Sequence, residues 1–342
     1  MTMKGLIMRA PKTMGIEEIE MPVMKDSDIL VKVKAVGICT WEQKAYQKTK
    51  YPFFGGHEIA GVVEKIGADV KTDVKVGDTV AIASIIRCGE CYYCRTNQDN
   101  LCLYGEDNAA DGEAWGPAGF ADYVLAKGYQ VYKLNNDMDY ALGTVSEPIA
   151  CVLRSVEKGN LDFGDICVVQ GAGIMGLLHV KLAKLRGATV IVSEPDENRR
   201  NKAVDAGADF AVNPFETDLK EFVFSKTGNV GAKAVFFTAG GAKAVEQAFT
   251  LIIQGGTIVL YGSLNPDVPI SLSPNMIHYS ETILTGAAKH TRKSFQEATQ
   301  LLANGSIDVS DLISERIPFK EYEFAFERAM SLDTYRVVFT MD

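Results

Sequence analysis

Four cysteines fall within fifteen residues of the sequence. Cys88, Cys91, Cys94 and Cys102 follow the pattern C-x2-C-x2-C-x7-C. Zinc prefers four such ligands in a tetrahedron, and the short spacings allow a tight loop around an ion that the fourth cysteine returns to close. Because protein would fill all four positions, the pattern predicts a structural zinc site. The alternatives are an iron–sulfur cluster or free thiols, and free thiols in such a loop would be prone to oxidation.

A second set of metal-binding residue types is more dispersed. It consists of Cys39, His57, Glu58 and Glu147. Sulfur, imidazole and carboxylate are ligands that zinc accepts, and a site with three protein ligands keeps a position open for substrate. The residue types alone do not establish such a site, because a cysteine, a histidine and two glutamates in a chain are more often unrelated.

A glycine-rich pattern lies between a predicted strand (166–170) and a predicted helix (174–186). The pattern G-x-G-x-x-G is formed by Gly171, Ala172, Gly173, Ile174, Met175 and Gly176. In this context it is typical of dinucleotide binding: the glycines make the turn, admit the pyrophosphate and allow close helix–strand packing. The first amides of the helix would then face the pyrophosphate.

An acidic residue follows the next predicted strand (189–193). Glu194 lies 23 residues after Gly171, and a carboxylate there accepts both ribose hydroxyls and repels a 2′-phosphate. The sequence therefore predicts NAD rather than NADP as the cofactor. Arg199 and Arg200 come soon afterwards and are the residues that could instead approach a phosphate.

Two kinds of element must position these residues. The first part of the chain contains short β-rich segments punctuated by glycine, which favours a barrel-like β domain. From about Glu147 strands and helices alternate, which predicts a doubly wound parallel sheet. We therefore expect an α/β protein with a β-barrel-like domain over residues 1–145, a doubly wound domain that carries the glycine-rich pattern over 146–286, and a C-terminal segment, 287–342, that returns to the first domain.

Composition excludes several classes of partner. The 342 residues carry a net charge of −9, which argues against nucleic acid and anionic membranes. No apolar run approaches the roughly 20 residues of a membrane span, and the first residues lack a signal peptide. Seven cysteines, an odd number, argue against a disulfide framework. These features favour a cytoplasmic protein.

The residues around His57 carry a longer signature. Residues 56–70 read G-H-E-x2-G-x5-G-x2-V, which resembles the signature of zinc-containing alcohol dehydrogenases of the medium-chain dehydrogenase/reductase superfamily. Gly37-Ile38-Cys39 resembles the family's first ligand segment. The four-cysteine cluster resembles its structural zinc loop, and Ser146-Glu147-Pro148 resembles its sorbitol and threonine dehydrogenase branch. Together these segments span most of the chain in the order expected of that family.

The resemblance implies a GroES-like catalytic domain and a Rossmann domain. It implies a catalytic zinc held by Cys39 and His57, with Glu58 and Glu147 as direct or water-mediated ligands, and hydride transfer from an alcohol to NAD. It further implies that Arg199 packs against the adenosine of NAD. Homo-oligomers, dimers or tetramers, are also implied.

Trp41 departs from the family pattern. Relatives place Ser or Thr at this position to begin a proton relay, and here Thr40 stands one place earlier while Lys44 occupies the place of a relay histidine. The alcohol proton could therefore pass to Thr40, to a zinc-bound carboxylate (Glu58 or Glu147), or to water, and we favour a carboxylate. Trp41 either packs beneath the loop or faces and narrows the pocket, as a wall suited to sugars.

The favoured function is oxidation of a secondary alcohol in a small polyol, sugar or hydroxy acid. One alternative is an enzyme similar to L-threonine 3-dehydrogenase, and another is a zinc-free quinone or enone reductase of the same superfamily. A third is a binding or redox-sensing protein that uses the cysteines as thiols. Lys289 and His290 lie where polyol dehydrogenases place substrate-binding side chains, although an exposed lysine is the simpler interpretation of Lys289.

Overall fold

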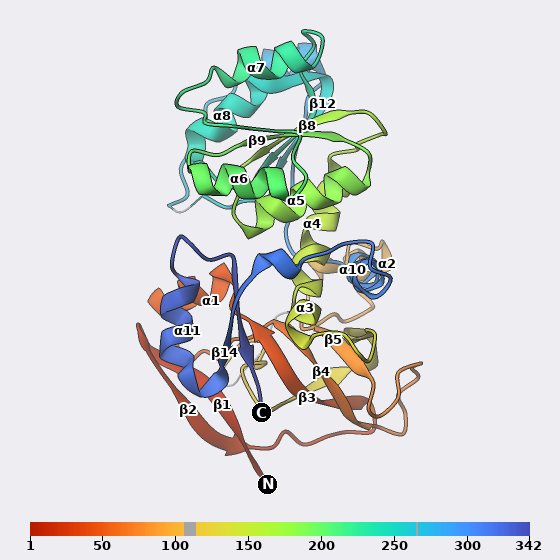
Figure 1. Cartoon of the computed structure of the whole chain (residues 1–342). Coiled ribbons are helices and arrows are strands. Elements are labelled where there is room, and N and C mark those ends of the chain that lie inside the picture. The colour runs from red at the N-terminus through yellow and green to blue at the C-terminus, as the bar shows by residue number, and fades with distance from the viewer. Residues whose placement is uncertain (106–113, 265) are drawn as a thin grey trace. The chain divides into compact units, whose positions relative to one another are not determined.

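A computed structural model describes residues 1–105, 114–264 and 266–342. The chain folds as two compact units (Figure 1). Unit 1 contains Met1–Ala150 and His290–Asp342, and unit 2 contains Cys151–Lys289. The first division therefore falls within helix α4 (Ser146–Lys158), a few residues after the expected position.

Unit 1 is built mainly from antiparallel β structure. Its large sheet has the strand order β14-β15-β3-β4-β5-β7, with β6 also paired to β3, and β1 pairs with β2 in a separate hairpin. The strands are β1 (Thr2–Ala10), β2 (Thr13–Glu20), β3 (Asp28–Gly37), β4 (Glu58–Ile66), β5 (Thr79–Ala83), β6 (Tyr123–Lys127), β7 (Val131–Lys133), β14 (Ile313–Pro318) and β15 (Arg336–Thr340). The sequence did not predict the β1–β2 hairpin.

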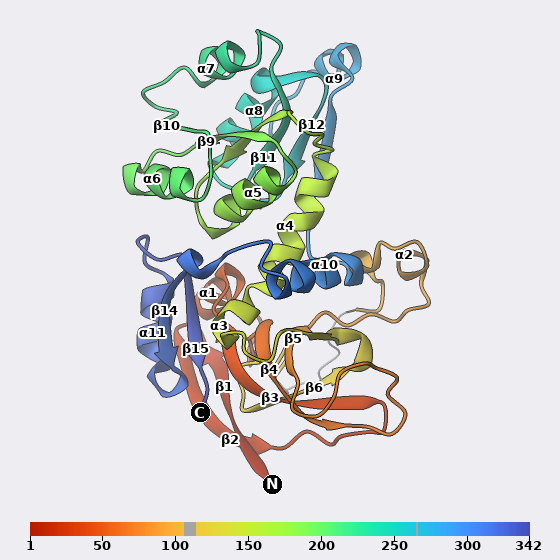
Figure 2. The same cartoon turned by 45° about the vertical axis from the view of Figure 1, so that its right-hand side comes forward.

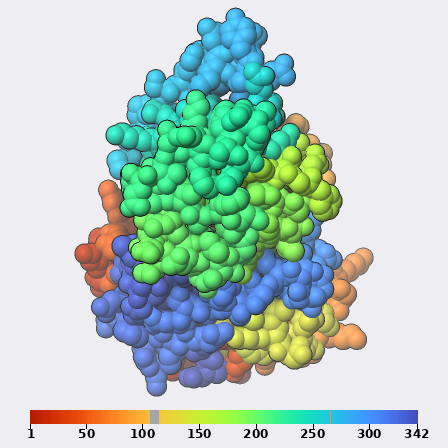
Figure 3. Space-filling model, turned by 45° about the horizontal axis from the view of Figure 1, so that its top comes forward, coloured from red at the N-terminus to blue at the C-terminus, as the bar shows by residue number. Residues whose placement is uncertain are grey.

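Unit 1 also contains helices. They are α1 (Thr40–Gln47), α2 (Tyr92–Arg95), α3 (Tyr140–Thr144), α10 (Arg292–Ala303) and α11 (Tyr322–Ala329), with 3-10 turns at Asp99–Leu101, Gly128–Gln130, Ser310–Leu312 and Phe319–Glu321. The core includes Phe120, Phe326 and Phe339, whose rings meet edge to face or tilted. The last segment of the chain, blue in Figure 3, forms part of the surface of unit 1, while its strand β15 lies between β14 and β3.

Unit 2 is a parallel sheet whose successive strands are connected by helices (Figure 2). The strand order is β10-β9-β8-β11-β12-β13, and all pairs are parallel. In chain order the elements are β8 (Ile166–Gln170), α5 (Ile174–Leu185), β9 (Thr189–Ser193), α6 (Glu197–Asp205), β10 (Phe210–Val212), α7 (Leu219–Lys226), β11 (Ala232–Phe237), α8 (Gly241–Leu251), β12 (Ile252–Leu260), α9 (Pro274–Ser280) and β13 (Ile283–Gly286). The order reverses between β8 and β11, so the predicted doubly wound sheet is confirmed.

A helix gives way directly to a strand in unit 2. Helix α8 ends at Leu251, and β12 begins at once with Ile252 and Ile253. Two adjacent β-branched residues favour the strand conformation. Gly255 then has a φ of 72°, a value that glycine adopts without strain.

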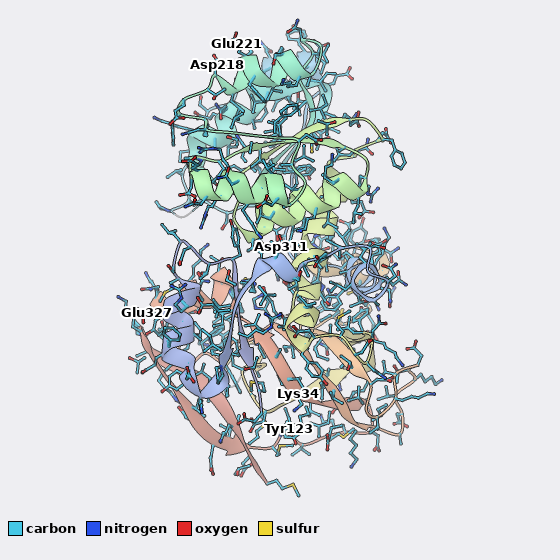
Figure 4. The ribbon with its side chains drawn as sticks, in the orientation of Figure 1. Lys34, Tyr123, Asp218, Glu221, Asp311 and Glu327 are labelled. Atoms are coloured by element: carbon cyan, nitrogen blue, oxygen red, sulfur yellow. The ribbon has the colours of Figure 1, made fainter. Side chains whose placement is uncertain are left out.

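Aspartate side chains cap two helices of unit 2. The Asp196 carboxylate accepts a 2.9 Å hydrogen bond from the Arg199 amide at the start of α6. Asp218 accepts a 3.0 Å bond from the Glu221 amide at the start of α7, where both residues are labelled in Figure 4. Such caps satisfy amides that the first helical turn leaves unpaired.

Among the described residues, no helix combines the length and the apolar character that a membrane crossing requires.

Candidate active site

The register of β3 and β4 brings the first group of candidate ligands together. Gly37, the last residue of β3, pairs with Glu58, the first residue of β4. Cys39 follows β3 and His57 precedes β4, so both reach the same end of the strand pair. One potential ligand atom from each of Cys39, His57 and Glu58 lies within 4.8 Å of the others. The structure therefore brings together three residues that the sequence separates.

Glu42 fixes the orientation of His57. This buried carboxylate on α1 lies 2.6 Å from His57 Nδ1 and accepts a 3.1 Å bond from the Gly56 amide. Its other oxygen accepts a 3.2 Å bond from the amide of Cys39. With Nδ1 held by a carboxylate, His57 keeps Nε2 for a metal, which is the arrangement that metal-binding histidines commonly use.

Arg336 compensates the charge of the buried Glu58. Arg336 Nη2 lies 2.9 Å from Glu58 Oε1, although the contact lacks hydrogen-bond alignment and neither oxygen of Glu58 has a hydrogen-bond partner among the described residues. Arg336 Nη1 donates to the carbonyl of Ile38 at 2.7 Å, which places the guanidinium beside the first ligand segment. The lone pairs of Glu58 therefore remain available to a cation.

The titration behaviour of this group also fits a cation. Burial is the main cause that raises the pKa of the Cys39 thiol, and it raises the pKa of Glu58 to about 7 although Arg336 and His57 act in the opposite direction. A divalent cation would stabilise both the thiolate and the carboxylate, since metal ligands must be deprotonated. Cys39, His57 and Glu58 therefore suit zinc in both donor type and charge.

Glu147 lies near this group but outside its most compact part. It stands in the first turn of α4, and its charge is among the causes that raise the pKa of Glu58. Its Oε1 is 4.0 Å from Nε2 of the buried His290. Glu147 is thus not one of the three residues whose potential ligand atoms lie within 4.8 Å of one another.

An aromatic wall, formed by Trp41, Phe53 and Trp115, stands beside His57. The ring centroids of Trp41 and His57 are 5.5 Å apart, and Trp41 also meets Phe53 at 5.1 Å and Trp115 at 6.2 Å. Trp41 nevertheless remains 43% exposed. Trp41 therefore lies beside the candidate ligand His57 and is partly open to solvent.

The four-cysteine cluster closes as the spacing predicted. One sulfur from each residue lies within 4.8 Å of the others. Three of the sulfur–sulfur distances are 3.6 Å (Cys88–Cys102), 3.9 Å (Cys88–Cys94) and 4.0 Å (Cys91–Cys102). A tetrahedron with zinc–sulfur bonds of about 2.3 Å has edges of about 3.8 Å. The amides of Glu90 and Cys91 donate to the Cys88 sulfur, as suits a thiolate.

The glycine-rich loop of unit 2 has the geometry of a dinucleotide-binding turn. Gly171 has a φ of 97°, and a Cβ on Gly176 would lie 2.0 Å from the Gly171 carbonyl oxygen, so helix and turn touch. A Cβ on Gly173 would meet nothing within 4 Å, which leaves room for a ligand. The Glu194 carboxylate accepts bonds from the amides of Ala172 (2.8 Å) and Asp196 (3.0 Å), so it lies at the edge of this turn.

Known proteins resemble this chain over nearly its whole length. Residues 25–136 match the alcohol dehydrogenase GroES-like domain, and residues 175–304 match the zinc-binding dehydrogenase family. The chain is 32% identical to L-threonine 3-dehydrogenase of Thermococcus kodakarensis over 97% of both chains. It is 30% identical to D-arabitol-phosphate dehydrogenase of Enterococcus avium over 98% of this chain and 97% of the other.

Among solved structures, a protein of Sinorhizobium meliloti assigned as a zinc-binding dehydrogenase and bound to NADP superposes with a TM-score of 0.89. It is 29% identical, with 99% of each chain covered. The chain belongs to the zinc-containing alcohol dehydrogenase family. The resemblance stated from the sequence is therefore confirmed, as is the combination of a GroES-like domain with a Rossmann-type sheet.

Two buried residues of this dehydrogenase were not predicted from the sequence. Glu42 could have been recognised as the third residue after Cys39, a spacing that returns a side chain to the start of a helix. Arg336 is a charged residue at the head of the apolar stretch Arg336–Thr340, a pattern that signals a buried ion pair. Glu42 contacts the candidate ligand His57, and Arg336 contacts the candidate ligand Glu58.

Three further expected participants, Thr40, Lys44 and Lys289, have exposed side chains. Thr40 and Lys44 are exposed on α1. Lys289 is exposed, and its carbonyl accepts a 2.9 Å bond from Arg154, both residues being in unit 2. Its neighbour His290 belongs to unit 1 and is buried.

Proposed function

We propose that the chain is an NAD-dependent zinc dehydrogenase that oxidises a secondary alcohol of a small polyol, sugar or hydroxy acid. The observation that carries this proposal is the convergence of Cys39, His57 and Glu58 within 4.8 Å beside the half-exposed Trp41. Donors of this kind suit a catalytic zinc, and an aromatic face suits the C–H groups of a sugar or polyol.

Two zinc ions have suitable ligands in this chain. Cys39 and His57 with Glu58 or Glu147 would hold a catalytic zinc, and the four-cysteine cluster would hold a structural one. When bound, the catalytic ion supplies Lewis acidity that lowers the pKa of the alcohol. The protein side chains provide the remaining functions of the site.

The protein contributes orientation, charge and a proton acceptor. Glu42 fixes the His57 ring, and Arg336 offsets the charge of Glu58. Trp41 has no hydroxyl group, and Thr40 is exposed. We therefore infer that the carboxylate of Glu58 or Glu147 receives the alcohol proton, because Glu58 belongs to the candidate ligand group and the charge of Glu147 acts on Glu58.

Glu194 supports NAD as the cofactor. Its carboxylate lies at the glycine-rich turn, where it would accept the ribose hydroxyls and repel the 2′-phosphate of NADP. A relative was solved with NADP, so the preference is best measured directly. We expect a higher kcat/KM with NAD and a smaller preference in Glu194→Gln. Equal kcat/KM values with the two cofactors in the unaltered protein would refute this assignment.

A substrate panel tests the activity. Polyols, aldonates and L-threonine are offered with NAD to protein of measured zinc content. We expect reduction of NAD by polyols or aldonates. The L-threonine 3-dehydrogenase alternative, which the relatives make the second candidate, predicts that L-threonine is oxidised with the highest kcat/KM. A zinc-free reductase predicts less than one zinc per chain.

We also propose a reducing compartment, the cytoplasm, since none of the seven cysteines forms a disulfide in the structure. A homo-oligomer, dimer or tetramer, is proposed on the family resemblance. Mass measurement of the native protein in solution tests this assembly, and a monomer at micromolar concentration would contradict it.

A further inference from the structure

The buried imidazole of His290 lies between the four-cysteine loop and Glu147. Its Nδ1 is 3.2 Å from Arg87 Nη2, and its Nε2 is 4.0 Å from Glu147 Oε1. The ring packs against Phe295, with ring centroids 4.9 Å apart, and the side chain is fully buried. His290 therefore has one nitrogen toward the loop and the other toward the carboxylate.

Arg87 determines which nitrogen of His290 carries the proton. A guanidinium only donates hydrogen bonds, so Nδ1 must accept from it. Arg87 Nη2 also donates to the His290 carbonyl at 2.8 Å, which holds the guanidinium in place. The carbonyl of Thr291, at 3.4 Å, is a more distant contact of Nδ1. The neutral ring accordingly carries its hydrogen on Nε2, facing Glu147.

The four-cysteine loop supplies and anchors Arg87. Arg87 immediately precedes Cys88, and Asp99 lies between Cys94 and Cys102. The buried Asp99 carboxylate is 3.1 Å from Arg87 Nε and 2.7 Å from Arg292 Nε. Two arginines thus share one carboxylate at the base of the loop. This ion-pair cluster ties the position of Arg87 to the fold of the metal loop.

We propose that His290 is a positioning residue that holds the Glu147 carboxylate through its Nε2–H, in the tautomer that Arg87 imposes. The inference rests on the proposed function, in which Glu147 serves the catalytic zinc. The separation of 4.0 Å exceeds a hydrogen bond, and a carboxylate movement of about 1 Å closes it. Catalytic hydrogen bonds commonly tighten in this way when the complex forms.

Two substitutions distinguish the roles of the two ring nitrogens of His290. His290→Asn keeps an acceptor near the position of Nδ1 for Arg87 but removes the donor toward Glu147. His290→Gln reaches the position of Nε2 with an amide N–H and retains that donor. A positioning role predicts that His290→Asn is the more damaging change. If His290 serves only to accept the hydrogen bond from Arg87, His290→Gln should be the more damaging change.

The first readout is the dissociation constant of catalytic-site zinc, measured on the full chain by competition with a chelator. The catalytic site is identified as the zinc-binding phase that is seen in the unaltered protein and is missing in Cys39→Ser. Loss of a hydrogen-bond partner to a metal ligand weakens binding by about 10–100-fold. We expect a loss of this order in His290→Asn and a smaller one in His290→Gln. Equal or reversed losses would overturn the proposal.

The second readout uses the unaltered protein, so it does not depend on whether a variant folds. The sequence has four histidines, so the ¹⁵N imidazole spectrum of the zinc-loaded protein contains few signals. We expect His290 to be neutral with its proton on Nε2. His179 provides an internal contrast, because its Nδ1 lies 2.7 Å from the Met175 carbonyl and must carry the proton. A proton on Nδ1 of His290 would contradict the assignment.

A Glu147→Gln variant separates failure of this inference from failure of the proposed function. If this variant binds catalytic zinc and turns over as the unaltered protein does, Glu147 is not part of the site and the ligand assignment fails. If Glu147→Gln is impaired while His290→Asn is not, the role of Glu147 stands and only the positioning role of His290 is wrong.

Discussion

The carboxylate of Glu42 lies 2.6 Å from Nδ1 of His57 and also accepts a 3.2 Å hydrogen bond from the amide of Cys39. One buried side chain therefore orients two candidate ligands at once. Three carboxylates, Glu42, Glu58 and Glu147, surround the site, and Arg336 and the metal would balance their charge.

Glu42→Gln should weaken the binding of catalytic zinc by about 10–100-fold, because an amide holds the imidazole less strongly than a carboxylate does. Chelator competition measures the change. Glu64→Gln, at an exposed position of β4, serves as the control and should leave zinc binding unaltered. Unchanged zinc affinity in Glu42→Gln would show that Glu42 does not support the ligand.

Gly37→Ala should disturb Glu58. The added Cβ would lie 2.2 Å from Glu58 Oε2, so the carboxylate must move. Overpacking of this kind costs about 1–3 kcal/mol of unfolding free energy. Gly15→Ala is the matched control, since its Cβ would meet nothing within 4 Å. Denaturant unfolding compares the two, and equal stability would contradict the close approach.

Gly173→Ala and Gly176→Ala should fail in different ways. The Gly173 position is open, so its alanine variant should fold normally but bind NAD more weakly, because the methyl group would meet the pyrophosphate. The Gly176 methyl group would lie 2.0 Å from the Gly171 carbonyl, so this variant should lose stability in unit 2. Calorimetric titration with NAD and thermal unfolding separate the outcomes. Normal NAD affinity in Gly173→Ala would refute the loop assignment.

His179 should make unit 2 sensitive to acid. Burial lowers its pKa from 6.5 to about 4, with its Nδ1–H bonded to Met175 and its Nε2 accepting from Ser155 at 2.8 Å. The unfolded state binds the proton more readily. The contribution of His179 to the unfolding free energy is therefore fully present above pH 6.5 and is lost as the pH falls from 6.5 toward 4. Linkage gives a loss of about 2 kcal/mol between pH 7 and pH 5.

Unfolding free energies at these two pH values test this expectation. His179→Gln should lack the His179 part of the pH dependence, whereas substitution of the exposed His278 by Gln should preserve it. Parallel pH profiles for the His179 and His278 variants would show that the buried imidazole is not the group responsible.

The sequence allowed prediction of those site residues that local patterns define. Spacing identified the four cysteines, and the strand–turn–helix context identified Gly171 and Gly173. Cys39 and His57 depended on a resemblance as well, since 18 positions separate them and only the register of β3 and β4 brings them together. The fold class followed from the alternation of strands and helices.

Long-range contacts could not be predicted in the same way. Arg336 reaches Ile38 across 298 positions, because β15 pairs with β3. The link from Arg87 to His290 spans 203 positions and involves no recurring motif. Trp41 was recognised as a departure, but its position against His57 depends on Phe53 and Trp115, which arrive from other segments.

The zinc content of Cys39→Ser and Cys94→Ser, measured together with NADH formation from secondary alcohols, tests the central claim most directly. The unaltered protein should contain two zinc ions per chain and reduce NAD. Cys39→Ser should weaken or lose one ion, and with it the activity, while keeping its fold. Cys94→Ser should lose the other ion and unfold more easily. Undiminished turnover in a Cys39→Ser protein that retains only the structural zinc would contradict the account.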